Sequence, residues 1–273
     1  MEARRDTAGV PAPDDAPAFD PELTGRIFAA LAETVLAYFR VRVLDAEHIP
    51  AGRGLLVGCH SGVFAWDATC LVVAVHQATG RFTRNVGDRF FSGLGPLTGF
   101  LQRTGVVIGE RDAVERLLAR DELVLVFPGG ADDMLRPIWR RYRLAANRGL
   151  KPGNGGYVKA ALRTGSPIVP VACIGTEEIH LMLGHLPPLA RLIGVPFFPV
   201  VASAVPLPAR VYLRFGAPIR FVEPPEAAAD QGTVDALNRR VQDALQGLID
   251  DTRRRRRGIY WSSYDDGGQE GEP

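Results

Sequence analysis

Short runs of uninterrupted apolar residues recur along this chain, and they constrain the fold more than any other feature. Residues 55–57, 123–127 and 167–171 read LLV, LVLVF and PIVPV. A strand whose two faces are both covered has this pattern, because neither face needs polar side chains. Helical patterns separate the runs, notably over residues 68–77 and 157–163. We therefore predict an α/β fold with a mostly parallel central sheet flanked by helices.

Further patterns extend this order along the chain. Strands are expected at residues 105–109 and 211–215, a strand or loop at residues 81–86, and helices at residues 23–44, 112–120 and 233–257. The helix over residues 23–44 either packs on the core or lies in a membrane interface. Glycine and proline punctuate residues 90–97, which we predict to form a loop over an apolar pocket or buried irregular structure.

The length of 273 residues suits one large domain. Residues 1–20 are rich in alanine, proline and aspartate and are predicted to be a disordered leader, and residues 263–273 a disordered tail. Residues 21–262 then form a single domain that begins with a helix.

The cysteines and the net charge limit which cellular compartment and which partners are expected. The three cysteines, an odd number, show no metal-ligand spacing and indicate reduced thiols, and the net charge of +1 gives no reason to expect nucleic acid. The N-terminus lacks an apolar signal region, and no run of ~20 apolar residues is present. We expect a cytoplasmic protein without a transmembrane helix, a bound metal or a permanent cofactor.

A histidine follows the first apolar run. Residues 55–67 read LLVGCHSGVFAWD, so His60 lies just past the predicted strand and Asp67 stands where the next helix begins. Ligands of open α/β sheets bind outside the carboxyl ends of strands. A neutral imidazole there can take a proton from a hydroxyl, while a carboxylate holds the ring in the required tautomer. Alternatively, His60 is a turn residue and Asp67 only caps the helix.

A second turn of interest ends the run at residues 123–127. Phe127 and Pro128 lead into Gly129 and Gly130, whose backbone N–H groups can approach a ligand closely, although two glycines equally suit a plain turn. Arginines and aromatic residues then alternate. They suit a basic, aromatic surface at a lipid headgroup or a coenzyme phosphate, and they are Arg136, Trp139, Tyr142 and Arg143.

Four blocks, spanning roughly residues 50–220, resemble the glycerolipid acyltransferases, the lysophosphatidic-acid-acyltransferase-like superfamily. The blocks are His60 with Asp67, GVVIGER at residues 105–111, FPGG at residues 127–130 and SPIVPV at residues 166–171. Within the superfamily, the chain looks closest to the bacterial branch similar to diacylglycerol acyltransferases.

The resemblance implies an O-acyltransferase of phospholipid or glycerolipid biosynthesis. It would move a fatty acyl group from acyl-CoA or an acyl-carrier protein to a lipid hydroxyl, with His60 as general base and Asp67 as its orienting partner. Arg111 would meet a substrate phosphate, or is a surface arginine at a helix start. The other expected substrate-binding residues are Phe127, Pro128, Gly129, Gly130 and Arg136. Two alternatives are a non-catalytic lipid-binding or transfer protein and an acyl-ester hydrolase.

Two departures from the family pattern bear on the substrate. Six residues separate the histidine from the aspartate of the first block, where the common spacing is four. Phosphate-acceptor members usually carry glutamate after Phe-Pro, whereas Gly129 is expected to leave space there. Asp132 and Asp133 follow, and their charge should repel an acceptor phosphate unless Arg136 neutralises it. We expect an acceptor with no phosphate next to the reacting hydroxyl.

Basic and apolar segments indicate a membrane partner. Residues 253–257 are five arginines close to Tyr260 and Trp261, which suits an anionic membrane surface, although a solvated helix end has the same composition. The apolar segments at residues 90–100 and 181–201 are candidates for an acyl-chain site. We expect peripheral association with the inner face of the cell membrane.

Overall fold

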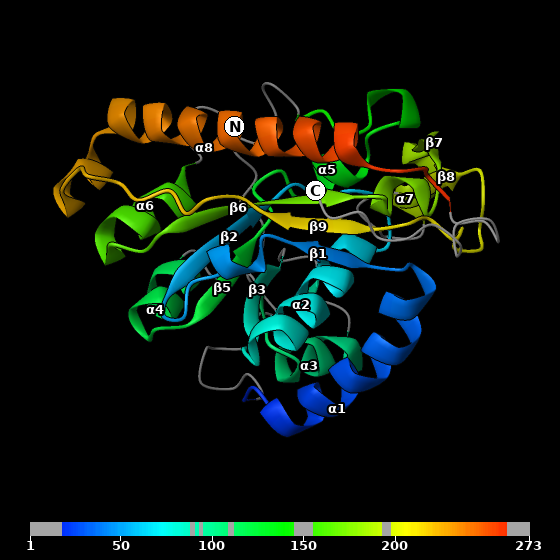
Figure 1. Ribbon diagram of the computed structural model, residues 1–273, viewed down its shortest axis with the longest axis horizontal. Helices are drawn as coiled ribbons and strands as arrows, with labels where there is room; N and C mark the ends of the chain where they lie inside the picture. The colour runs from blue at the N-terminus through cyan, green and yellow to red at the C-terminus, as the bar shows by residue number, and fades with distance from the viewer. Residues whose placement is uncertain are drawn as a thin grey trace.

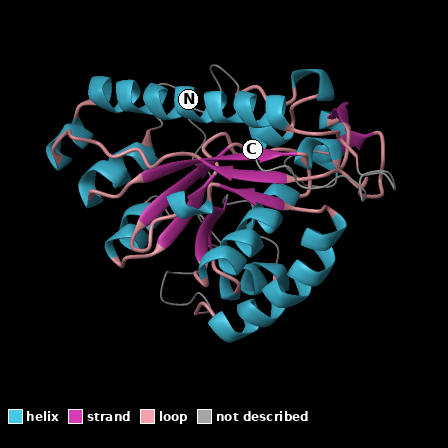
Figure 2. Ribbon diagram, viewed as in Figure 1, coloured by secondary structure: helices cyan, strands magenta, loops and turns pink. Residues whose placement is uncertain are grey.

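A seven-stranded sheet runs through the molecule, with helices on both faces (Figure 1 and Figure 2). This computed structural model describes residues 18–87, 91–92, 95–108, 112–144, 155–192 and 198–260, without the side chains of residues 131 and 132. The strands of the sheet are β1 (Arg42–Leu44), β2 (Gly54–Gly58), β3 (Thr83–Gly87), β4 (Val106–Ile108), β5 (Leu123–Val126), β6 (Ile168–Ile174) and β9 (Tyr212–Phe215).

Helices occupy most of the connections between these strands. They are α1 (Pro21–Leu31), continued by a π-helical segment (Ala32–Leu36), α2 (Trp66–Thr79), α3 (Pro96–Arg103), α4 (Ala113–Ala119), α5 (Ala131–Met134), α6 (Gly156–Thr164), α7 (Pro187–Leu192) and α8 (Gln231–Arg255). A separate antiparallel pair joins β7 (Met182–His185) to β8 (Pro199–Val201). No helix that the structure describes combines the length and hydropathy needed to cross a bilayer.

The strand order of the large sheet is β1-β9-β6-β2-β5-β3-β4. The strands from β6 to β4 are parallel, while β9 runs antiparallel to β6 and parallel to β1. Strand β2 lies between β5 and β6, with Leu55 opposite both Val124 and Ile168. The expected α/β class, a mostly parallel central sheet flanked by helices, is confirmed.

The apolar residues of strand β2 are consecutive because both faces of the strand are buried. Leu55 and Val57 pack on the face covered by α4, α6 and α8, while Leu56 packs on the face covered by α1 and α2. In Figure 1, α8 crosses above the sheet and α1, α2 and α3 lie below it. Each such side chain contributes roughly 1.5–3 kcal/mol by leaving water, so both faces hold the strand in place.

Two segments differ from the sequence expectation. The helix expected over residues 23–44 ends earlier: Arg40 adopts a left-handed φ of 44°, and Arg42–Leu44 pairs with β9 as strand β1. The expected loop at residues 90–97 is in part helix α3, with Pro96 in its first turn. N–H groups of the first turn have no partner within the helix, so the missing N–H of proline costs no helical hydrogen bond there. Phe90 lies outside the described residues.

The expected disordered leader is described only from residue 18, and the expected tail not at all. Asp20 belongs to the folded domain, because its carboxylate accepts the Leu23 N–H at 2.9 Å and caps α1. The ring of Phe19 also packs edge-on against Phe82, with centroids 5.4 Å apart. The folded domain therefore begins before residue 21.

Replacing Leu125 by alanine should destabilise the protein. Leu125 is fully buried in β5, so its loss leaves a cavity and should lower the free energy of unfolding by about 2–5 kcal/mol. The same change at Leu192, which is 81% exposed, should cost less than about 0.5 kcal/mol. Urea denaturation measures both, and equal losses would contradict the placement of β5.

Candidate active site

The loop after β2 brings His60 and Asp67 together in spite of the long spacing. His60 Nδ1 lies 2.8 Å from Asp67 Oδ2, and the same oxygen accepts the Ser61 N–H at 2.9 Å. Asp67 is completely buried in the first turn of α2, where the helix dipole favours a carboxylate. The capping position belongs to Ala65, so the alternative reading of Asp67 as the helix cap is wrong.

Backbone conformation explains how the longer loop closes. Phe64 and Ala65 adopt left-handed φ angles of 65° and 53°, which turn the chain sharply into α2. Gly62 has a φ of 88°, and a Cβ there would lie 2.4 Å from the carbonyl oxygen of Thr176. The loop therefore packs directly on the segment that follows β6.

The imidazole of His60 is fixed on one face. It stacks on Phe127 with centroids 3.9 Å apart and planes inclined by 15°. Gly58 makes room for that ring, because a Cβ there would lie 2.8 Å from it. When Nδ1–H donates to Asp67, Nε2 carries the lone pair, and no hydrogen bond to Nε2 is present within the described residues. This arrangement suits a general base.

The neighbouring nucleophile types are occupied or unreactive. The Ser61 hydroxyl is buried, 2.6 Å from Thr176 Oγ1 and 3.2 Å from the Cys173 carbonyl oxygen. Burial raises the pKa of the Cys59 thiol well above its usual range, and Asp133, 3.3 Å away, raises it further. Of these groups, His60 is the one poised for proton transfer.

The turn after β5 is tighter than expected. Gly130 N–H donates to the Phe127 carbonyl oxygen at 3.0 Å and is not available to a ligand in this geometry. Gly129 N–H makes no hydrogen bond within the described part of the chain. A Cβ on Gly129 would lie 1.9 Å from Asp133 Oδ2, so the space expected beside Gly129 is filled by this carboxylate. The expectation of an open position there is wrong.

Arg136 lies inside the protein and is 9% exposed. Its Nε donates to the Asp133 carbonyl oxygen at 3.0 Å and its Nη1 to the Arg143 carbonyl oxygen at 2.5 Å. Its Nη2 donates to the His60 carbonyl oxygen and lies 3.2 Å from Glu177 Oε1. The guanidinium thus makes four contacts with the chain itself and positions the His60 loop.

The expected basic, aromatic surface is therefore divided. Trp139 is 71% exposed and Arg143 is exposed, but Tyr142 is 2% exposed and Arg136 faces inward. Tyr142 and Arg136 face inward because buried carboxylates form hydrogen bonds and an ion pair with them, and a solvent-facing position would not supply these partners.

Those carboxylates, Glu177 and Glu178, are functional candidates that the sequence interpretation missed. Glu177 Oε1 accepts the Tyr142 N–H at 3.0 Å, and Glu178 accepts the Tyr142 hydroxyl. Burial raises the pKa of Glu177 to about 7, although Arg136 and the Tyr142 N–H oppose this. The available signal was a Glu-Glu pair that begins three residues after the end of a wholly apolar strand, where charged residues need buried partners.

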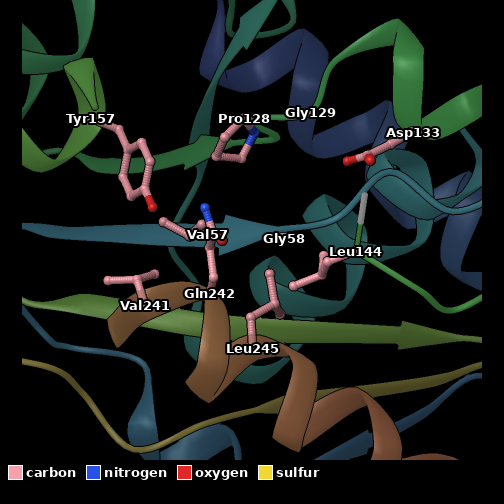
Figure 3. Close-up of a pocket in the computed structure, with 10 residues that line it drawn as sticks. All are labelled: Val57, Gly58, Pro128, Gly129, Asp133, Leu144, Tyr157, Val241, Gln242 and Leu245. Carbon is pink, nitrogen blue, oxygen red and sulfur yellow. The ribbon is translucent and has the colours of Figure 1, made fainter. Parts of the chain in front are cut away.

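A cavity of about 30 Å³ opens beside the turn at Gly129 (Figure 3). Its walls come from the end of β2, the turn after β5, and helix α8. The lining residues are Val57, Gly58, Pro128, Gly129, Asp133, Leu144, Tyr157, Val241, Gln242 and Leu245. The volume holds about two water molecules rather than an acyl chain.

Two further expectations concern Arg111 and a metal ion. Arg111 lies outside the described residues, so its expected contact with a phosphate stays a prediction. Within the described ranges, no group of three histidine, cysteine, aspartate or glutamate residues is placed to hold a metal ion.

Comparison with known proteins shows the family of this chain. The family model described as Acyltransferase matches residues 40–174. An uncharacterized protein of Mycobacterium tuberculosis is 34% identical over 248 residues, which cover 85% of this chain and 68% of that protein. An uncharacterized protein of Mycobacterium leprae is 34% identical over 250 residues, covering 85% and 66%.

A solved structure shares the fold. The 1-acyl-sn-glycerophosphate (LPA) acyltransferase PlsC of Thermotoga maritima superposes with a TM-score of 0.55 and 15% identity, over 87% of this chain and 84% of that one. The chain belongs to the acyltransferase family, and it shares the fold of that structure. The resemblance carried by the four sequence blocks is thereby confirmed at the level of the acyltransferase family.

Gly129→Ala should destabilise the protein through its clash with Asp133. Forcing a methyl group against that buried carboxylate should cost about 1–3 kcal/mol of unfolding free energy. The penalty should shrink when the same change is made in an Asp133→Ala background, because the opposing oxygen is then absent. Chemical denaturation of the four proteins gives the coupling, and additive effects would contradict the contact.

Proposed function

We propose that this acyltransferase moves a fatty acyl group from an acyl thioester to the hydroxyl of a lipid, with His60 as general base. The observation that supports this most directly is the 2.8 Å contact between His60 Nδ1 and Asp67 Oδ2. It presents Nε2 as a proton acceptor just past the carboxyl end of β2, where ligands of α/β sheets bind.

The reaction needs one proton acceptor and no covalent enzyme intermediate. His60 Nε2 takes the proton of the acceptor hydroxyl while the oxygen attacks the thioester carbonyl carbon. The tetrahedral intermediate collapses with cleavage of the carbon–sulfur bond, and the imidazolium returns the proton to the departing thiolate. Asp67 stabilises the imidazolium and keeps Nδ1 protonated throughout.

The developing oxyanion needs a hydrogen-bond donor. Gly129 N–H is a candidate because no group within the described residues accepts it, whereas Gly130 N–H serves its own turn. A well-placed donor of this kind typically contributes about 3–4 kcal/mol to the transition state. The stacked ring of Phe127 keeps water from one face of the imidazole.

A membrane surface and a soluble acyl donor complete the proposal. Exposed apolar side chains occur in the loop after β2 and in the segment after β6. They are Phe64, 58% exposed, Leu183 at 46%, Leu186 at 47% and Leu192 at 81%. They suit a protein that rests on the cytoplasmic leaflet and takes its acceptor from it. Acyl-CoA or an acyl-carrier protein supplies the acyl group, in phospholipid or glycerolipid biosynthesis.

The acceptor is proposed to carry no phosphate next to its reacting hydroxyl. The carboxylate of Asp133 lines the cavity beside Gly129 and accepts a hydrogen bond from the Cys59 thiol at 3.3 Å. A carboxylate at this position disfavours a second anion. A monoacylglycerol, a diacylglycerol or a glycolipid sugar would meet no such repulsion.

His60→Ala should lower acyl transfer by about 10²–10⁴-fold, the usual contribution of a general base. Asp67→Asn should cause a smaller loss, because it removes charge and leaves the base in place. His185→Ala, the same change at an exposed histidine, should leave turnover unaffected. Thiol release from acyl-CoA, with and without a lipid acceptor, measures all three.

The same assay separates the alternatives. Release that depends on the acceptor supports transfer, and release without any acceptor would identify a hydrolase. Acyl-CoA binding without release would identify a lipid-binding protein. Near-normal turnover in folded His60→Ala protein would refute the mechanism.

Competition between two acceptors tests the lipid class. Monoacylglycerol should be preferred to lysophosphatidic acid of equal acyl length in matched detergent. Asp133→Asn should improve kcat/KM for lysophosphatidic acid more than for monoacylglycerol, because it removes the repelling charge. A preference of the parent protein for lysophosphatidic acid by tenfold, about 1.4 kcal/mol, would overturn the proposal.

A further inference from the structure

A basic hollow lies on the surface at the C-terminal end of α8. It has a volume of about 320 Å³ and is lined by Arg143, Asp250, Arg253, Arg254 and Arg256. Four of the five lining residues are arginines, so their formal charges sum to +3. In Figure 1, this end of α8 reaches the same end of the sheet as the carboxyl terminus of β6.

Two of the guanidinium groups are held in place by buried residues. The guanidinium carbons of Arg253 and Arg256 lie 5.2 Å and 5.8 Å from the ring centre of Tyr142. Both terminal nitrogens of Arg256 are 3.1 Å from Glu178 Oε1. Arginines fixed in this way have already lost side-chain freedom, so the entropy cost of ordering them when a ligand binds is smaller. Arg253 and Arg256 therefore do not fit the alternative of a solvated helix end at residues 253–257.

The remaining charge is incompletely balanced. Arg254 is 3.1 Å from Asp251, and Arg253 is only within 4.0 Å of Asp250. The Arg143 guanidinium makes no hydrogen bond or ion pair within the described residues, although its carbonyl oxygen accepts from Arg136. Like charges gathered in one hollow repel each other unless an anion joins them, and guanidinium forks match the oxygens of phosphate.

We propose that this hollow binds a phosphate group. Two sources share the chemistry: a soluble nucleotide phosphate, such as the donor would carry if it is a coenzyme A thioester, and the phosphate of an anionic lipid. The site lies apart from His60 and binds without turnover. It is linked to the His60 loop through Tyr142, Glu177 and Arg136.

Two probes test the proposal on the full chain. Adenosine 3′,5′-bisphosphate is titrated by calorimetry, and phosphatidylcholine vesicles with and without phosphatidylglycerol are sedimented with the protein at low salt. Arg143→Ala combined with Arg254→Ala removes two exposed arginines and keeps the main-chain carbonyl that Arg136 binds. This variant should weaken binding of at least one probe by about tenfold or more.

The matched control is Arg239→Ala combined with Arg240→Ala. It removes the same charge from exposed positions of α8, roughly 21 Å along the helix from Arg254. It should change affinity by less than about twofold. Loss confined to the nucleotide, or to the phosphatidylglycerol vesicles, identifies the source of the phosphate.

The proposed site would be overturned if the parent protein binds neither probe, or if the two double variants lose equal affinity. The measurement is repeated on His60→Ala protein. This variant should bind both probes as the parent protein does, because the hollow lies apart from His60. Phosphate binding by a parent protein that shows no acyl transfer would refute the proposed function alone, and transfer without phosphate binding would refute the hollow alone.

Discussion

The buried guanidinium of Arg136 is the contact on which the site depends. It joins the loop after β2, the segment around α5 and the segment after β6, through the His60 carbonyl oxygen, the Asp133 carbonyl oxygen and Glu177. A buried charge without its partner typically costs about 3–5 kcal/mol, so these segments are held together by the penalty of separating them. The base is positioned through its main chain by Arg136 and through its ring by Asp67 and Phe127.

The order of the strands explains why these segments meet. Because β2 lies between β5 and β6, its loop, the turn at Gly129 and the Glu177 segment leave the sheet side by side at the carboxyl ends. The glycines make the contact close: Gly58 admits the ring of Phe127, and Gly62 lies against Thr176. The catalytic pair thus relies on three neighbouring strands rather than on one local sequence.

The sequence predicts what is encoded locally. Strands such as Leu123–Val126 and the place of His60 past β2 follow from apolar runs and turns. Helix α3 escapes prediction because Gly95 and Pro96 are typical of loops, although Pro96 fits a first helical turn. The ion pair between Arg136 and Glu177 spans 41 positions, and no periodicity within either segment could reveal it. Strands β7 and β8 also depend on pairing across a distance in sequence.

The base and the basic hollow stand at opposite ends of one buried polar network. From the surface inward, Arg256 pairs with Glu178, which accepts the Tyr142 hydroxyl, and Glu177 accepts the Tyr142 N–H and pairs with Arg136. Two glutamates flank a single tyrosine, and each of them faces a guanidinium. Such a network is stable only when every member is satisfied. It can therefore hold the arginines of the hollow and the loop of His60 on the same support.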